Sequence, residues 1–272
     1  MSPRPCEENM KKIWMLLMFL FLFVSASKAE LVKELVEYKD GDTALEGYVV
    51  YDNATEGKRP GVIVIHDWMG FGEYGNMRAD MLAELGYVAF AADIYGKGVR
   101  PKDAAEAGAQ AGKFKGDRTL LRQRVIAALN ELKKHPMVDA AKTGAIGYCF
   151  GGTTVLELAR SGADVTGVVS FHGGLGKGEV AGTDSINAKV LVLHGADDPH
   201  VPPEEIAAFM KEMNDAKADW QMVHYSGAVH SFTKEAAGND KASGNAYDAT
   251  ADKRSWKAMK GFFKEIFGME KK

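Results

Sequence analysis

The feature that most constrains the fold is the alternation of short apolar runs with helical patterns along most of the chain. The runs at 61–66 and 87–92 are continuously apolar, which is typical of strands covered on both faces. Strands that alternate with helices predict a mainly parallel sheet with helices on both faces, that is, an α/β fold. Further strands are expected at 143–147, 165–171, 189–194 and 220–225, and helices at 77–85, 117–134, 152–160, 203–214 and about 247–267.

Two segments depart from this alternation. Residues 31–38 and 43–51 are strand-like and are joined by Asp-Gly-Asp, which predicts a hairpin. Residues 96–116 are rich in Gly, Ala and Lys with weak periodicity, so we expect a lid or an excursion over a site. No internal repeat or long linker is present, and residues 30–272 are therefore predicted to form one domain.

The sharpest chemical signal is the segment 147–152, which reads Gly-Tyr-Cys-Phe-Gly-Gly. It lies directly after a predicted strand and before a predicted helix, the context of the G-x-nucleophile-x-G turn of α/β-hydrolases. Glycines are needed there because the turn is too tight for side chains, and the helix N-terminus favours negative charge on Cys149. The alternative is a buried, inert cysteine that packs as a small apolar group.

An acid and a base are expected on loops after later strands. The strand at 189–194 leads into a loop with Asp197 and Asp198, and the spacing Gly-x-x-Asp-x-x-Val-Pro favours Asp198. The strand at 220–225 is followed by a glycine-containing loop with His230. Each residue alone is equally explained as a turn residue. Together, in this order, they predict a nucleophile, an acid and a base.

These motifs resemble the dienelactone hydrolase family. The resemblance extends over nearly all of residues 30–272 and includes the segments 65–71 and 92–96. It implies an α/β-hydrolase fold and hydrolysis of an ester or lactone through a thioester on Cys149. His230 would take the thiol proton and later activate water, while Asp198 would fix the histidine tautomer.

The resemblance also implies supporting residues, two of which differ from the family pattern. The backbone N–H groups of Phe150 and Trp68 would form the oxyanion hole. Asp67 stands where the family has a thiol-activating glutamate, and Lys234 where it has an arginine that holds a substrate carboxylate. Trp68 and Tyr95 are candidates either for lining the pocket or for simple packing.

Other classes of function find little support. The slightly acidic net charge of −3 gives no reason to expect nucleic acid. No phosphate loop or dinucleotide motif is present, so no cofactor is expected. Two alternatives stay open, a non-catalytic ligand-binding protein on this scaffold and a thiol redox protein. No metal is expected either, because the remaining histidines lack ligand spacing: His66, His172, His194, His200 and His224.

The first 29 residues have the pattern of a cleaved signal peptide. Lys11 and Lys12 precede the twelve-residue apolar run 13–24, and Ser-Lys-Ala before Glu30 fits a cleavage site. The run is shorter than the ~20 residues that span a bilayer, so no stable membrane anchor is expected. Cleavage would remove Cys6 and change the net charge to about −5. We therefore expect an exported monomer, periplasmic or secreted, with a single thiol.

Overall fold

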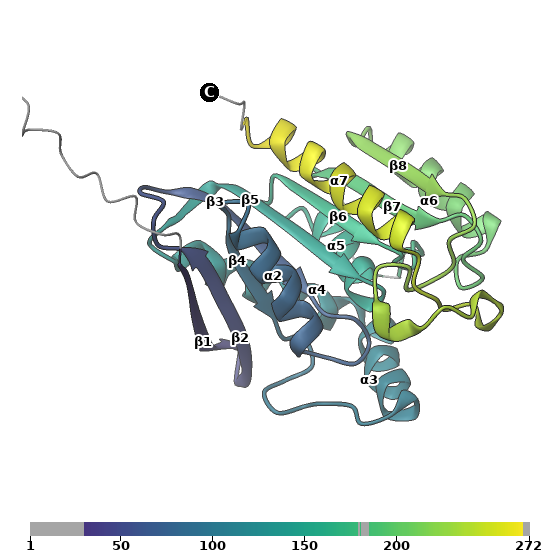
Figure 1. Ribbon diagram of the computed structural model, residues 1–272, viewed down its shortest axis with the longest axis horizontal. Helices are drawn as coiled ribbons and strands as arrows, with labels where there is room; N and C mark the ends of the chain where they lie inside the picture. Colours follow the sequence, from purple (N-terminus) through teal and green to yellow (C-terminus); the bar gives the residue numbers. More distant parts are fainter. Residues whose placement is uncertain (1–29, 179, 181–184, 269–272) are drawn as a thin grey trace, which may run out of the picture.

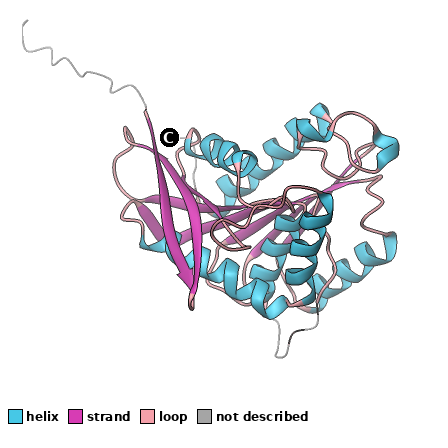
Figure 2. Ribbon diagram, turned by 90° about the horizontal axis from the view of Figure 1, so that it is seen from below, coloured by secondary structure: helices cyan, strands magenta, loops and turns pink. Residues whose placement is uncertain are grey.

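The computed structural model describes residues 30–178, 180 and 185–268. These form an eight-stranded sheet in the order β1-β2-β4-β3-β5-β6-β7-β8, with helices on both sides (Figure 1; Figure 2). The predicted α/β architecture is thus confirmed. The predicted signal peptide, residues 1–29, lies outside the described residues. In the part of the chain that the structure describes, no helix is long and apolar enough to cross a membrane.

The sheet is antiparallel at its start and parallel thereafter. The predicted hairpin is present, because β1 pairs antiparallel with β2, and β2 pairs antiparallel with β4. From β4 through β3 to β8 every pairing is parallel, so these strands end at one edge of the sheet. The strands are β1 (Leu31–Asp40), β2 (Thr43–Asp52), β3 (Arg59–Ile65), β4 (Val88–Ala92), β5 (Val138–Tyr148), β6 (Gly167–Phe171), β7 (Lys189–Gly195) and β8 (Trp220–Tyr225).

The helices divide between the two faces of the sheet. One face is covered by α2 (Glu73–Ala83) and α7 (Ala249–Ile266), whose apolar side chains join one core cluster. The other is covered by α4 (Arg118–Lys134), α5 (Phe150–Arg160) and α6 (Pro203–Asp215), whose side chains join a second cluster. Two short 3₁₀ helices, η1 (Glu235–Ala237) and η2 (Lys241–Ser243), lie between β8 and α7.

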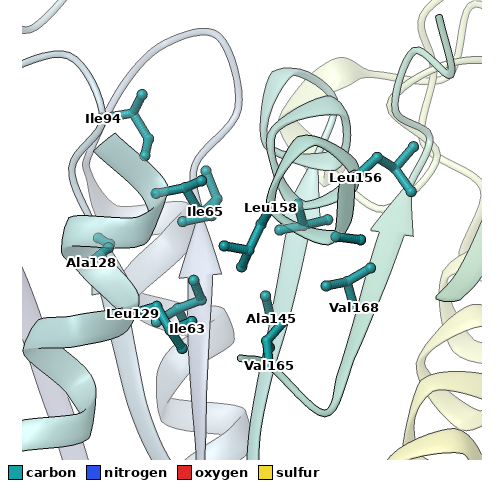
Figure 3. Close-up of a cluster of buried hydrophobic side chains, with 14 of the residues drawn as sticks. Ile63, Ile65, Ile94, Ala128, Leu129, Ala145, Leu156, Leu158, Val165 and Val168 are labelled. Atoms are coloured by element: carbon teal, nitrogen blue, oxygen red, sulfur yellow. The ribbon is translucent and has the colours of Figure 1, made fainter. Parts of the chain in front are cut away.

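The second cluster shows why the parallel strands are continuously apolar. Ile63 of β3 lies beside Leu129 of α4, and Leu158 of α5 lies over Ala145 of β5 (Figure 3). These side chains are at most 2% exposed. Burial of a large aliphatic side chain stabilises a fold by about 1.5–3 kcal/mol. The strands are apolar on both sides because the opposite faces pack against α2 and α7.

A buried ion-pair network joins the helices of this face. Glu157 of α5 is fully buried and accepts hydrogen bonds from Arg122 Nε at 2.8 Å and Arg160 Nη1 at 3.1 Å. Arg160 also donates to the Glu212 carboxylate at 2.7 Å and to the Leu175 carbonyl at 2.8 Å. The network therefore attaches the loop after β6 to α5 and α6.

The structure differs from the sequence prediction most in the segment 96–116. Residues 104–116 form α3 (Ala104–Gly116), which begins at an Asp103 cap that accepts a hydrogen bond from the Glu106 amide. Phe114 fixes the helix by stacking on Tyr95 at a centroid distance of 5.5 Å. The segment is thus a packed helix, and its end reaches the cavity described below.

Candidate active site

Cys149 lies in the sharp turn between β5 and α5. Its φ of 55° and ψ of −112° place a non-glycine residue in a region that L-amino acids rarely adopt. The turn is held by a hydrogen bond from the Cys149 amide to the Phe171 carbonyl at 3.0 Å. Such local strain is concentrated at functional sites, where the surrounding structure maintains it. The thiol is free and partly exposed, as a nucleophile requires.

The glycines around Cys149 are required by close backbone contacts. A Cβ atom on Gly147 would lie 2.0 Å from the Gly151 carbonyl oxygen, and one on Gly151 would lie 2.3 Å from the Ile65 carbonyl oxygen. A Cβ atom on Gly152 would lie 2.7 Å from the Gly173 Cα. The first turn of α5 therefore packs directly on the ends of β3 and β6, which brings three loops together at Cys149.

His230 and Asp198 form a buried pair beside this turn. His230 Nδ1 lies 2.8 Å from Asp198 Oδ2, and the other carboxylate oxygen accepts a hydrogen bond from the His200 amide at 2.9 Å. Both residues are less than 10% exposed, whereas the neighbouring Asp197 is exposed. The structure thus places Asp198, the favoured acid of the two, against the histidine.

The electrostatics of this pair favour a protonated His230. Burial disfavours the imidazolium, but hydrogen bonds to Asp198 and to the Cys149 side chain outweigh it and raise the pKa of His230 to about 10. Burial would also raise the pKa of Asp198, yet the hydrogen bond with His230 lowers that pKa below its ordinary value. An imidazolium held between a carboxylate and a sulfur stabilises negative charge on that sulfur.

Phe150 and Trp68 lie on either side of the contact between α5 and the end of β3. Phe150 begins α5, where a helix leaves its first backbone N–H groups without partners inside the helix. Trp68 follows the end of β3, which packs against the first turn of α5. The Tyr95 hydroxyl donates to the Trp68 carbonyl at 2.9 Å. Tyr95 is itself buried and supports the Trp68 loop rather than lining the cavity.

Asp67 and Lys234 pair with each other. Asp67 Oδ2 accepts a hydrogen bond from Lys234 Nζ, and Oδ1 accepts one from the Met69 amide at 2.8 Å. The Cys149 side chain acts on His230, whose pKa it helps to raise. The resemblance implied that Asp67 contacts the thiol and that Lys234 holds a substrate carboxylate. In the structure each is the partner of the other.

These residues surround a cavity of about 590 Å³. A larger and more open depression of about 890 Å³ lies along α2 and α7 and includes none of the predicted site residues. Within the described residues, no group of His, Cys, Asp and Glu has the arrangement of a metal site. Besides Asp67, Cys149, His230 and Lys234, the smaller cavity is lined by Trp68, Tyr74, Lys115, His172, His200 and Asn245, among others.

His172 is the main residue of the cavity that the sequence motifs do not indicate. It follows β6, and its ring packs edge-on to His230 at a centroid distance of 5.2 Å. Its Nε2 lies 2.7 Å from the Thr233 hydroxyl, which also contacts the Tyr74 hydroxyl at 2.7 Å. Burial holds the pKa of His172 well below its ordinary value, so this ring is neutral. The sequence signal that could have indicated His172 is its position directly after an apolar strand.

This fold and this arrangement of loops define an α/β-hydrolase. A family model, described as the dienelactone hydrolase family, matches residues 45–267. The chain therefore belongs to the dienelactone hydrolase family, and it is a hydrolase. The family predicted from the sequence motifs is therefore confirmed.

Individual relatives agree with this assignment. The crystal structure of a dienelactone hydrolase-like promiscuous phosphotriesterase from metagenomic libraries is 45% identical, covers 88% of this chain and 100% of its own, and superposes with a TM-score of 0.83. A Bradyrhizobium protein named probable 2-oxo-3-(5-oxofuran-2-ylidene)propanoate lactonase is 31% identical over 65% of this chain and 74% of its own. A carboxymethylenebutenolidase homolog of Rattus norvegicus is 27% identical over 69% of this chain and 76% of its own.

Proposed function

We propose that this hydrolase cleaves small carboxylic esters or lactones through a Cys149–His230–Asp198 triad. The Cys149 sulfur attacks the substrate carbonyl carbon, and its proton is held by His230. Collapse of the tetrahedral intermediate forms a thioester and releases the alcohol, which takes the proton from His230. Water then attacks the thioester, gives its proton to His230 and releases the acid and the thiol.

One observation carries this proposal. His230 is held at 2.8 Å by Asp198 on one nitrogen and interacts with the Cys149 side chain, inside the cavity of a hydrolase-family fold. A base oriented by an acid and directed at a nucleophile is the geometry that acyl transfer requires. The proposal assigns the backbone N–H groups of Phe150, at the start of α5, and of Trp68 to stabilisation of the oxyanion.

The direct test is hydrolysis of 4-nitrophenyl butyrate by the wild type and by single variants. We expect Cys149→Ala and His230→Ala to abolish the catalysed rate, and Asp198→Asn to lower kcat by about 10²–10⁴-fold. Asp197→Asn is the matched control, since that neighbouring carboxylate is exposed. Full activity of Cys149→Ala would refute the nucleophile, and equal losses in the two aspartate variants would refute the acid.

The acyl-enzyme gives an independent test. Rapid acid quench during turnover, followed by mass spectrometry, should show Cys149 carrying the butyryl group and no adduct in Cys149→Ala. Two rival functions predict other results. A ligand-binding protein would protect Cys149 from alkylation without turnover, and a redox protein would form a sulfenate with peroxide and have no esterase activity.

Phosphotriesters are a second candidate substrate class. The observation that favours them is the 45% identical relative described as a promiscuous phosphotriesterase. The same sulfur would attack phosphorus and displace an aryl oxide, and water would then release the phosphodiester. Hydrolysis of diethyl 4-nitrophenyl phosphate that requires Cys149 would support this activity.

We also propose that the protein is exported and that residues 1–29 are removed. The support is the sequence of two lysines, a twelve-residue apolar run and a small-x-small site before Glu30. Expression with a C-terminal tag, cell fractionation and N-terminal sequencing test it. A new N-terminus at Glu30 outside the cytosol is the expected result, and an intact cytosolic chain would refute it.

A further inference from the structure

The Asp67–Lys234 pair is part of the wall of the catalytic cavity. Asp67 belongs to the loop after β3 that also carries Trp68, and Lys234 belongs to the loop that carries His230. The two side chains are 9% and 26% exposed. The pair therefore joins two of the loops that form the site, and a substrate bound at Cys149 is close to it.

The Lys234 ammonium is already neutralised in this position. Asp67 provides its counter-ion, and the Tyr74 ring lies 5.5 Å from Nζ, within the range of a cation–π contact. The backbone at Lys234 is held as well, because Arg78 Nη2 donates to the carbonyl of the preceding Thr233 at 2.7 Å. Asp67 is fixed by its hydrogen bond from the Met69 amide.

A negatively charged substrate would meet this arrangement unfavourably. To bind Lys234, its carboxylate would have to displace Asp67, or else lie beside a second carboxylate. A desolvated carboxylate without a partner is strongly disfavoured, whereas an uncharged group has no such penalty. The other charged groups have little effect on the binding of an anionic substrate. His230 is paired with Asp198. Lys115 is exposed at the end of α3, where solvent weakens its field.

We propose that the Asp67–Lys234 pair makes this site selective for uncharged esters and lactones, and that Asp67 is the residue that excludes anionic ones. This proposal rests on the proposed function, because it concerns the substrate of the same cavity. Asp67 acts as a specificity-determining residue by occupying Lys234. Removal of its charge alone should leave an unpaired ammonium in the cavity, which attracts a substrate carboxylate.

The test compares two substrates that differ in charge, the 4-nitrophenyl half-ester of adipic acid and its methyl ester. We expect wild type to favour the methyl ester by about tenfold in kcat/KM, equivalent to ~1.4 kcal/mol. Asp67→Asn keeps an oxygen for the Met69 amide and should shift the ratio by about tenfold or more toward the anion. Adding Lys234→Met to Asp67→Asn should remove that gain.

Lys115→Met is the control for the exposed rim. It should change the substrate ratio by less than about threefold, because exposed charges interact weakly. An equal or larger effect of Lys115→Met, or a wild type that prefers the anion and is unchanged by Asp67→Asn, would overturn the proposal. If Asp67→Asn does not fold, Asp67→Ser serves the same comparison, since its hydroxyl is also an acceptor for the Met69 amide.

Alkylation of Cys149 separates this proposal from the proposed function. Iodoacetate and iodoacetamide differ in charge and react with the thiol without turnover. Asp67→Asn should raise the iodoacetate rate relative to iodoacetamide by about tenfold, and Lys234→Met should cancel that rise. This shift without any esterase activity would support the inference and refute the function. Cys149-dependent esterase activity without the shift would do the reverse.

Discussion

Replacement of Asp198 by Asn tests the electrostatic basis of the site through the stability of the fold. In the structure the pKa of His230 is raised from 6.5 to about 10. A raised histidine pKa stabilises the folded state fully below pH 6.5, and that contribution is lost as the pH rises toward 10. The difference between these two pKa values corresponds to a folding free energy of ~5 kcal/mol, since one pKa unit is about 1.36 kcal/mol.

Cys149 causes part of the rise in the pKa of His230. The experiment is therefore best done in a Cys149→Ala background, where no thiol titrates. The remaining share, due to Asp198, should be about 2–4 kcal/mol. In Asp198→Asn on this background the contacts that raise the pKa of His230 are gone, and burial holds that pKa below its ordinary value. In that variant the titration of His230 should therefore not lower the free energy of unfolding between pH 6.5 and 10. The pKa of Asp198 is itself depressed, so its own titration lies below this window.

Urea unfolding followed by tryptophan fluorescence, at about pH 6.5 and about pH 10, gives the two free energies for each variant. Lysines and tyrosines elsewhere titrate alike in both variants and cancel in the difference. From about pH 6.5 to about pH 10, the free energy of unfolding should fall by about 2–4 kcal/mol more in Cys149→Ala than in the variant that also carries Asp198→Asn. Equal falls in the two variants would refute the inferred stabilisation of the imidazolium by Asp198.

Three further predictions concern supporting residues. Gly147→Ala should prevent folding or destabilise by more than about 4 kcal/mol, because its Cβ would lie 2.0 Å from a carbonyl oxygen; Gly108→Ala in α3, where the space is open, should stabilise by about 0.5–1 kcal/mol in urea unfolding. Glu157→Gln should lower stability by about 3–5 kcal/mol in thermal melts, because Arg122 and Arg160 lose the buried carboxylate that lies between them. Tyr95→Phe should lower kcat severalfold by releasing the Trp68 carbonyl, and an unchanged kcat would contradict this.

Much of the fold followed from the sequence because the central parallel strands β3, β4, β6 and β7 are buried on both faces. Such strands are marked by continuous apolar runs, and all eight expected strands are present. The helix α3 was missed because Gly108 and Gly112 weaken its periodicity. Its Asp103 cap and the packing of Phe114 on Tyr95 decide its conformation, and that packing joins separate parts of the chain.

The candidate site was predictable in part. The order of the three loops was enough to predict that Cys149, Asp198 and His230 lie together, because the ends of parallel strands meet at one edge of a sheet. The choice between Asp197 and Asp198 needed burial, which spacing only suggested. The pairing of Asp67 with Lys234 depends on how two distant loops approach each other, and no local pattern contains that information.

The order of the strands also determines when the candidate site is complete. Cys149 follows β5, in the middle of the chain, whereas His230 follows β8, the last strand to be synthesised. During translation the thiol therefore emerges long before His230. The nascent chain carries an unassisted thiol until β8 has docked on β7 and the segment leading to α7 has packed. Assembly of the candidate site is thus a late event in biosynthesis, because a chain truncated before β8 lacks His230.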